Sequence, residues 1–335
     1  MEKNGWTPAD LLQLSGGYWS TCALHAGVKL DLFTPLAAEA LTSPVLAVRL
    51  GCDERGLTML LNALTALGLL AKGNERYAAT PSATRFLART SPDYLGHIIL
   101  HHHHLMASWL HLADGVRNGR PVREQLSHTD EETVRESFEM GMFNLAMLAA
   151  PLIVPHIDLS GRRRLLDLGG GPGTYAIHFC LHNPELTALV YDLPSTRPFA
   201  EITIARFGLA NRIEFTDGDF IEGDIDGRYD VAWLSHILHA EGPEECALIL
   251  RKTAAALEPG GMVLVQEFIL DDTRDVPLFP ALFSLNMLLG TTAGQSYSQE
   301  ELTAMLKAAG FTDVRRIPLE LPNGAGVMAA TVPSN

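Results

Sequence analysis

The sequence has few cysteines, no long apolar run and no leader-like start. Its four cysteines lie far apart with no CxxC pair, which argues against a disulfide framework or a zinc site. No apolar run reaches the ~18 residues that a membrane span needs. The first residues, MEKNGWTPAD, lack the basic and apolar regions of a signal peptide. We therefore expect a cytoplasmic protein with no metal and no membrane partner.

Basic side chains are also scarce. The chain of 335 residues has 25 Lys and Arg against 39 Asp and Glu, a net charge of −14. Residues 1–95 carry eight basic and eight acidic side chains, so the excess of acidic residues lies in residues 96–335. No segment of the chain forms a basic domain. This balance argues against a nucleic-acid partner. With 47% hydrophobic residues, the length suits a globular protein of about two domains.

Residues 1–95 are predicted to be helical apart from one small strand pair. Apolar spacing predicts helices over Trp19–Phe33, Pro44–Leu50 and Gly56–Leu67, followed by a short strand at Tyr77–Ala79. This order is typical of a winged-helix domain. The third helix contains no Lys or Arg, whereas a helix that reads DNA needs positive charge. We expect that helix to be buried and the domain to serve in packing or dimerisation.

The rest of the chain divides into a helical segment, 96–158, and an α/β domain, 159–335. Helices are predicted over His97–Val116 and Glu131–Ala150. From residue 162 onward, short apolar runs alternate with helical stretches, which predicts a doubly wound parallel sheet, and the tail predicts an antiparallel hairpin at its edge. The predicted strands are Arg164–Leu168, Ala188–Tyr191, Arg212–Thr216, Tyr229–Leu234 and Met262–Phe268.

A glycine-rich turn follows the first predicted strand. Gly169, Gly170, Gly171 and Gly173 lie in Asp-Leu-Gly-Gly-Gly-Pro-Gly, and glycine allows a tight turn and a close approach to a nucleotide. The next strand ends at Asp192, about 20 residues later, where a carboxylate can accept the hydroxyls of a ribose. Further on, Asp219 and Phe220 are placed to contact an adenine amino group and ring. An NAD oxidoreductase shares such a turn, but its usual GxGxxG and Tyr-x-x-x-Lys patterns are missing.

These pieces together resemble the class I S-adenosylmethionine-dependent small-molecule O-methyltransferases with an N-terminal dimerisation domain. The resemblance covers nearly the whole chain. It rests on the glycine turn, on Tyr191-Asp192-Leu193-Pro194, on Gly218-Asp219-Phe220 and on Phe143-Asn144-Leu145-Ala146-Met147. It implies S-adenosylmethionine as cofactor, a small aromatic or conjugated hydroxyl compound as acceptor and a homodimer as assembly.

The resemblance also implies roles for individual residues. His239 falls on the family's general base and Glu267 on the carboxylate that orients it, while Ser235 stands where the family has a cofactor-contacting Lys. We expect the acceptor to contact Phe143, Met147, Asn286 and Ser296. The sequence departs from the family pattern at Ser296, which replaces a second Glu, and at Ala240-Glu241, which replaces Asp-Trp.

Two other functions stay open at this stage. Because the second Glu is missing, a C- or N-methyltransferase on the same scaffold is one alternative. Because the N-terminal pattern is that of a winged helix, a cofactor-binding regulatory protein that contacts DNA is the other. The run His101–His104 suggests a metal site, but no carboxylate or cysteine at ligand spacing completes it. We interpret these histidines as pocket-lining or solvent-facing residues.

Overall fold

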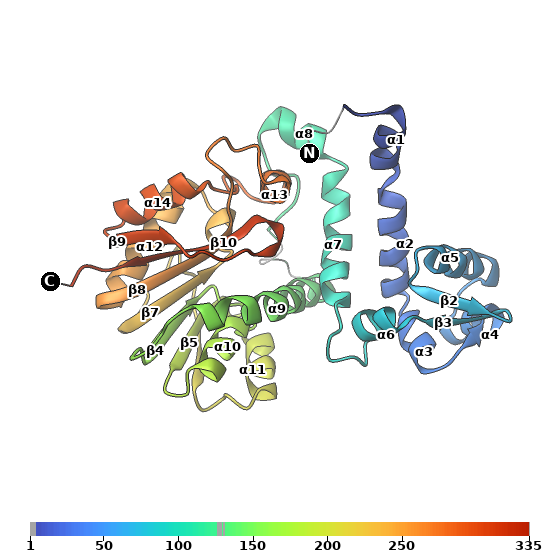
Figure 1. Ribbon diagram of the computed structural model, residues 1–335, viewed down its shortest axis with the longest axis horizontal. Helices are drawn as coiled ribbons and strands as arrows, with labels where there is room; N and C mark the ends of the chain where they lie inside the picture. The colour runs from blue at the N-terminus through green and yellow to red at the C-terminus, as the bar shows by residue number, and fades with distance from the viewer. Residues whose placement is uncertain (1–4, 126–128, 130, 335) are drawn as a thin grey trace. The chain divides into compact units, whose positions relative to one another are not determined.

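The computed structural model describes residues 5–125, 129 and 131–334 (Figure 1). The chain forms two compact units, Met1–Leu105 and Met106–Asn335. The finer division at residues 95 and 158 stays a prediction. The helices and strands lie within about two residues of most of the predicted ranges.

The N-terminal unit is helical with one small antiparallel sheet. Buried leucines from several helices, including Leu36, Leu46 and Leu61, form its core. The predicted strand pair is present and a third short strand, β1, joins it, in the order β1-β3-β2. The elements are α1 Pro8–Gly16, α2 Tyr18–Lys29, α3 Phe33–Ala38, β1 Leu41–Thr42, α4 Ser43–Leu50, α5 Glu54–Ala66, β2 Leu70–Gly73, β3 Arg76–Ala79, α6 Pro81–Leu87 and the start of α7 Gly96–Trp109.

Two expectations for the first helices need correction. Helix α5, predicted over Gly56–Leu67 as a buried helix, buries only Leu57, Leu61 and Leu64, and its other face is largely exposed because its apolar residues follow one stripe. The predicted helix His97–Val116 is interrupted: α7 ends at Trp109 and α8, Leu112–Asn118, begins after a turn.

The C-terminal unit is built on a seven-stranded sheet in the part of the chain that the structure describes. Its order is β6-β5-β4-β7-β8-β10-β9; the first five strands are parallel, and β10 pairs antiparallel with both of its neighbours. The predicted doubly wound sheet with a C-terminal hairpin is therefore confirmed. The strands are β4 Arg164–Leu168, β5 Thr187–Asp192, β6 Ile213–Asp217, β7 Tyr229–Ser235, β8 Leu257–Phe268, β9 Thr312–Arg316 and β10 Ala325–Thr331.

Helices cover both faces of this sheet. Alternating strand residues such as Leu165 and Leu166 point to opposite faces, and each face packs into its own core. One core is shared with α9, α10 and α11, the other with α12 and α14. The helices are α9 Glu132–Ile153, α10 Thr174–His182, α11 Arg197–Arg206, α12 Pro243–Ala256, α13 Leu278–Gly290 and α14 Gln299–Ala308.

Helix α9 is longer than predicted because it continues through Pro151. Its length and apolar composition would also suit a membrane span, a test that the core helix of a soluble protein passes as well. Ala150 and Ile153 are fully buried in the core beside the sheet, and the helix also buries Glu139 and Asn144. The contacts are those of a core helix.

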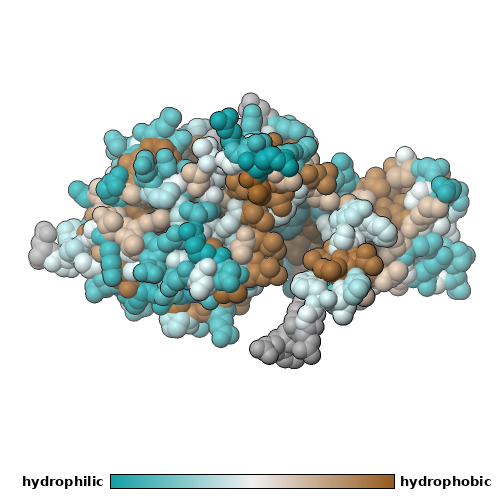
Figure 2. Space-filling view, turned by 90° about the horizontal axis from the view of Figure 1, so that it is seen from above, coloured by the Kyte–Doolittle hydropathy of each residue, from teal (hydrophilic) through white to brown (hydrophobic). Residues whose placement is uncertain are grey.

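The first two helices leave large apolar side chains at the surface. Helix α1 buries no residue, and Leu12 and Trp19 are 73% and 70% exposed. Figure 2 shows hydrophobic side chains gathered at the surface of the molecule. Such a surface favours association of two copies, as the sequence analysis expects.

We expect the change of Leu12 and Trp19 together to Asp to shift the protein from a dimer toward a monomer of about 36.4 kDa, because both side chains are exposed in the single chain. Light scattering at micromolar concentration measures the mass. Ile202→Asp, at an exposed apolar position on α11, is the control and should leave the dimer intact. A wild-type protein that is monomeric at this concentration would refute the assignment.

Candidate active site

The glycine turn lies between the end of β4 and the start of α10. Gly169, Gly171 and Gly173 have φ of +63°, +55° and +75°, a region that side-chain-bearing residues rarely adopt. A Cβ at Gly169 would lie 2.5 Å from a methyl carbon of Ile237, so that site also requires glycine for space. A Cβ at Gly171 would meet only a Glu139 oxygen, at 3.9 Å, so the backbone there is open to a ligand.

Asp192 ends β5 beside this turn. Its Oδ2 accepts from the Gly171 N–H at 2.7 Å, while Oδ1 accepts from the Leu193 N–H at 2.7 Å and from the Thr196 hydroxyl at 3.3 Å. The carboxylate thus braces the turn and the following loop. These contacts place it at the predicted ribose position, and its role toward a ribose stays a prediction.

The adenine-side residues of the sequence analysis lie on the loop after β6. Asp219 Oδ1 accepts from the Ile221 N–H at 2.8 Å, and its Oδ2 has no hydrogen-bond partner among the described residues. The Phe220 ring lies against the glycine turn, 3.3 Å from where a Cβ of Gly169 would stand. Ser235, at the end of β7, donates to Gln266 Oε1 at 3.2 Å.

Two buried carboxyl groups lie at this turn, and one of them, Glu139, was missed by the sequence analysis. Glu139 accepts from the Thr196 hydroxyl at 3.1 Å. Burial, and then the charge of Asp192, raise its pKa to about 8. Burial likewise raises the pKa of Asp167 to about 7, and its Oδ1 has no partner among the described residues. The available signal was a charged residue four positions before Phe143, on a face otherwise read as apolar.

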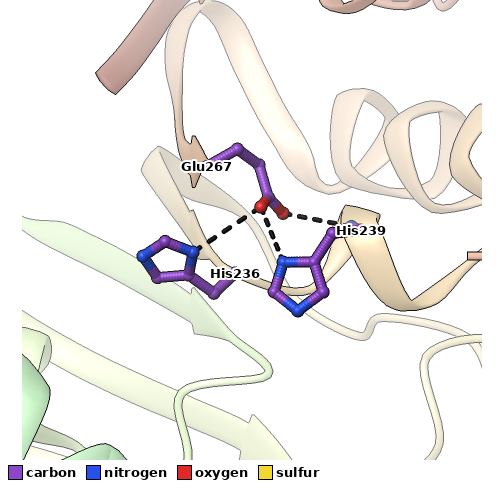
Figure 3. Close-up of side chains that lie close together, drawn as sticks. All are labelled: His236, His239 and Glu267. Atoms are coloured by element: carbon purple, nitrogen blue, oxygen red, sulfur yellow. Dashed lines mark hydrogen bonds and ion pairs between the residues drawn. The ribbon is translucent and has the colours of Figure 1, made fainter. Parts of the chain in front are cut away.

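At the other side of the site, His236, His239 and Glu267 converge (Figure 3). Glu267 ends β8 and is 1% exposed. Its Oε2 lies 2.7 Å from His239 Nδ1 and 3.6 Å from His236 Nδ1, and its Oε1 accepts from the His239 backbone N–H at 3.2 Å. Burial alone would raise the pKa of Glu267, but the two imidazoles outweigh it and hold that pKa well below its usual range.

An ionised Glu267 fixes the chemistry of His239. A carboxylate only accepts hydrogen bonds, so Nδ1 of His239 carries the proton and Nε2 has the free lone pair. Figure 3 shows that second ring nitrogen pointing away from Glu267. In the neutral imidazole, Nε2 is then the ring nitrogen that can accept a proton.

His236 was given no role in the sequence analysis. Its φ of +58° is unusual for a non-glycine residue and turns the ring toward Glu267 and onto Phe268, with ring centroids 4.3 Å apart. The Nδ1 atoms of His236 and His239 and a Glu267 oxygen all lie within 4.8 Å, a spacing that could hold a metal ion. An ion there would have to replace the proton between His239 and Glu267.

The residues that were predicted to contact the acceptor all lie in the C-terminal unit. Ser296 is fully buried, its N–H donates to Ser284 Oγ at 3.0 Å, and its own hydroxyl has no partner among the described residues. Phe143 and Asn286 are also buried. Met147 packs on α10, with Sδ 3.4 Å from His178 Nε2. Their contact with an acceptor stays a prediction.

Helix α13, which the sequence analysis missed, supplies an aromatic wall beside His239. Phe283 meets the His239 ring edge to face at 4.8 Å, and Phe279 and Phe283 both pack on Phe268. The segment after α13 closes on the same base, since a Cβ at Gly294 would lie 2.5 Å from the His239 carbonyl oxygen.

Comparisons with known proteins agree with this geometry. Residues 109–312 match the O-methyltransferase domain, and residues 12–89 match the O-methyltransferase dimerisation domain. The chain belongs to the S-adenosylmethionine-dependent O-methyltransferase family. The enzyme's cofactor is therefore S-adenosylmethionine, and the dimerisation domain supports a homodimer.

The similarity extends over whole chains. The 3-hydroxy-5-methyl-1-naphthoate 3-O-methyltransferase of Streptomyces sahachiroi is 36% identical over 96% of this chain and 94% of its own. The tetracenomycin polyketide synthesis 8-O-methyl transferase of Streptomyces glaucescens is 34% identical over 94% and 95%. The structure of human N-acetylserotonin methyltransferase in complex with S-adenosylmethionine superposes with a TM-score of 0.84 at 26% identity, covering 99% of this chain and 100% of that one. Family membership favours an O-methyltransferase over the C- or N-methyltransferase and regulatory alternatives.

Glu139 makes the stability of the cofactor-free enzyme depend on pH. Between its ordinary value of 4.5 and about 8, the folded state keeps a proton that the unfolded chain has released, so stability falls as pH rises through this window. We expect Glu139→Gln to remove this loss. Its free energy of unfolding relative to wild type should increase from pH 5 to pH 8, on the order of a few kcal/mol.

Urea unfolding without cofactor at several pH values between 5 and 8 measures this difference. Glu136→Gln is the matched control, because Glu136 is exposed on the same helix and should leave the pH dependence unchanged. If the curves of Glu139→Gln and wild type run parallel across the range, Glu139 is ionised in the folded state and the assignment is wrong.

Proposed function

We propose that His239 is the general base of this O-methyltransferase and that it deprotonates a hydroxyl of a small aromatic acceptor. The observation that carries the proposal is the 2.7 Å contact between His239 Nδ1 and the buried Glu267 carboxylate. That contact leaves Nε2 free to take a proton, and Glu267 stabilises the imidazolium that forms.

The proposed reaction is an in-line methyl transfer. His239 Nε2 takes the hydroxyl proton as the acceptor oxygen forms its bond to the methyl carbon, and the carbon–sulfur bond breaks. S-adenosylmethionine supplies the sulfonium-activated methyl group and leaves as S-adenosylhomocysteine. The protein contributes position, deprotonation and exclusion of water. Phe268 and Phe283 pack on the His239 ring, and Phe279 packs on both of them.

The residues at the glycine turn fit the cofactor. The open backbone at Gly171 gives room for close approach, and the buried carboxyl groups of Asp167 and Glu139 would release their protons beside a ligand with an ammonium and a sulfonium group. Asp192 would hold the ribose, with Asp219, Phe220 and Ser235 beside the adenosine, as the sequence analysis expects. Gly169 and Gly170 would line the turn.

Two observations favour an aromatic acceptor: the phenylalanine cluster beside His239 and the names of the relatives. Rings stack favourably on the Phe268, Phe279 and Phe283 cluster. The names of two relatives specify a naphthoate and a tetracenomycin polyketide as their substrates. We infer an aromatic hydroxyl compound of similar size for this enzyme, in contact with Phe143, Met147, Asn286 and Ser296.

Removal of Asp192 should weaken cofactor binding. We expect Asp192→Ala to lose about 1.5–3 kcal/mol of affinity for S-adenosylhomocysteine, the range for a hydrogen bond to a charged group. Asp192→Asn should lose less, because an amide oxygen can still accept from the Gly171 N–H. Calorimetry measures both. Asp217→Ala is the control, because the exposed carboxylate of Asp217 pairs with Arg197. Equal binding by wild type and Asp192→Ala would refute the ribose assignment.

Removal of the base should slow turnover without affecting the cofactor. We expect His239→Ala to lower kcat by about 10²–10⁴-fold with unchanged affinity for S-adenosylhomocysteine. Glu267→Gln should lower kcat by a smaller factor, because the amide oxygen can still orient the His239 ring but cannot balance the positive charge of the imidazolium. Wild-type activity should fall at acid pH, because a protonated imidazole cannot accept a proton, and His239→Ala should lose that dependence.

Initial rates of label transfer from methyl-labelled cofactor, across pH, distinguish the cases. His182→Ala, an exposed histidine on α10, is the control. An acceptor of high pKa that His239→Ala still methylates at nearly the wild-type rate would show that no general base is needed. A panel that includes aromatic amines tests the choice of oxygen over nitrogen.

A further inference from the structure

Arg123 lies on the loop after α8 and is packed against the end of α13. The backbone N–H groups of Val122 and Arg123 donate to the Leu289 carbonyl at 2.9 and 3.2 Å. Its guanidinium covers Gly290, where a Cβ would lie 2.4 Å from Cζ of the arginine. The absence of a side chain at residue 290 therefore makes room for this cation.

The guanidinium has few partners. Nη1 donates to the Glu124 carbonyl at 3.1 Å, and Nη2 has a long contact of 3.5 Å to Asn286 Oδ1. Nε is buried with no partner, and no carboxylate forms an ion pair with Arg123 among the described residues. By contrast, Arg162 and Arg212 each donate to two carbonyl groups at ordinary distances.

An arginine with so few partners destabilises the folded protein. Arginine stays charged in proteins, and partial burial without a counter-ion costs free energy. Burial lowers the pKa of Arg123, which reports the same cost. The chain has an excess of acidic residues, yet none of those described pairs with this one.

The position of Arg123 relates it to the base. Phe283, Asn286 and Gly290 are spaced i, i+3 and i+7, so they share one face of α13. Phe283 contacts the His239 ring and Gly290 contacts Arg123. A rise of 1.5 Å per residue separates the two ends of this face by roughly 10 Å along the helix axis.

We propose that Arg123 binds an anionic substituent of the acceptor, so that the substrate class is an aromatic hydroxy acid with its hydroxyl at His239 and its carboxylate at Arg123. The proposal rests on the proposed function and specifies the substrate of the same site. A guanidinium binds a carboxylate with two parallel hydrogen bonds, which would also use the unpartnered Nε. The naphthoate in the name of one relative belongs to this chemical class.

The test compares a charged acceptor with a neutral one of nearly equal shape. The probes are 3-hydroxy-5-methyl-1-naphthoate and its carboxamide. We expect wild type to prefer the acid, and Arg123→Gln to raise KM for the acid by about 10- to 100-fold, the ratio that corresponds to roughly 1.5–3 kcal/mol. The KM for the amide should stay the same, and Arg123→Lys should recover part of the loss.

Arg117→Gln is the control, because Arg117 is exposed on α8 and pairs with Asp114. Thermal unfolding and S-adenosylhomocysteine binding report whether each variant is folded. A purely structural role for Arg123 would impair acid and amide alike, and that result overturns the proposal. An enzyme that methylates both probes equally well overturns it too, while leaving the O-methyltransferase function intact.

Calorimetry with S-adenosylhomocysteine present separates this proposal from the proposed function. Tight binding of the acid by wild type, with weak binding by Arg123→Gln, supports Arg123 even if turnover is slow. Equal binding of acid and amide by wild type counts against it, and requires no variant to fold.

Discussion

The buried charge of Glu267 is the constraint on which the rest of the active site depends. A carboxylate that is 1% exposed needs partners, and both imidazoles and the His239 backbone N–H turn toward it. The chain after β7 bends accordingly: His236 takes a φ of +58°, and His239 sits on a 3-10 turn, Leu238–Ala240. The His239 ring is oriented because the buried carboxylate needs hydrogen-bond partners.

The site then divides by charge. Asp167, Glu139 and Asp192 gather at the glycine turn, where a cationic cofactor is expected, and Arg123 stands near the far end of α13. Buried carboxyl groups without counter-ions have raised pKa values, as Glu139 and Asp167 do, and a cationic ligand would favour their ionised forms. The two ends of the site thus carry ionisable groups of opposite kind, buried carboxyl groups at the glycine turn and the Arg123 guanidinium at the end of α13.

Much of this was predictable from sequence because it follows periodic patterns. Strand β4 was predicted at its observed bounds, since a short apolar run before a glycine turn has few alternatives. Helix α13 was missed because it is apolar on nearly all sides and shows no helical period. The break between α7 and α8 was missed because the turn that separates them contains neither Gly nor Pro.

Individual polar residues were harder to predict than elements. His239 and Glu267 were found through a family resemblance, whereas Glu139 and Arg123 depend on tertiary packing that no local pattern encodes. Glu139 becomes unusual only when α9 buries it beside Asp192, and Arg123 only when Gly290 makes room for it. The one local signal, a charge on the apolar face that includes Phe143, indicates neither that Glu139 is buried nor what it contacts.

The replacement of a second carboxylate by Ser296 changes the balance around the base. Ser296 is neutral, and among the described residues Glu267 is the carboxylate that contacts both imidazoles, whose rings lie 5.8 Å apart. One carboxylate can balance one imidazolium, and protonation of both rings would leave a net positive charge beside Phe268 and Phe283. As the proposed base, His239 would accept the acceptor's proton at lowest cost when His236 carries no charge. The two imidazoles thus share one carboxylate, and the φ of +58° at His236 keeps its ring within 3.6 Å of that carboxylate.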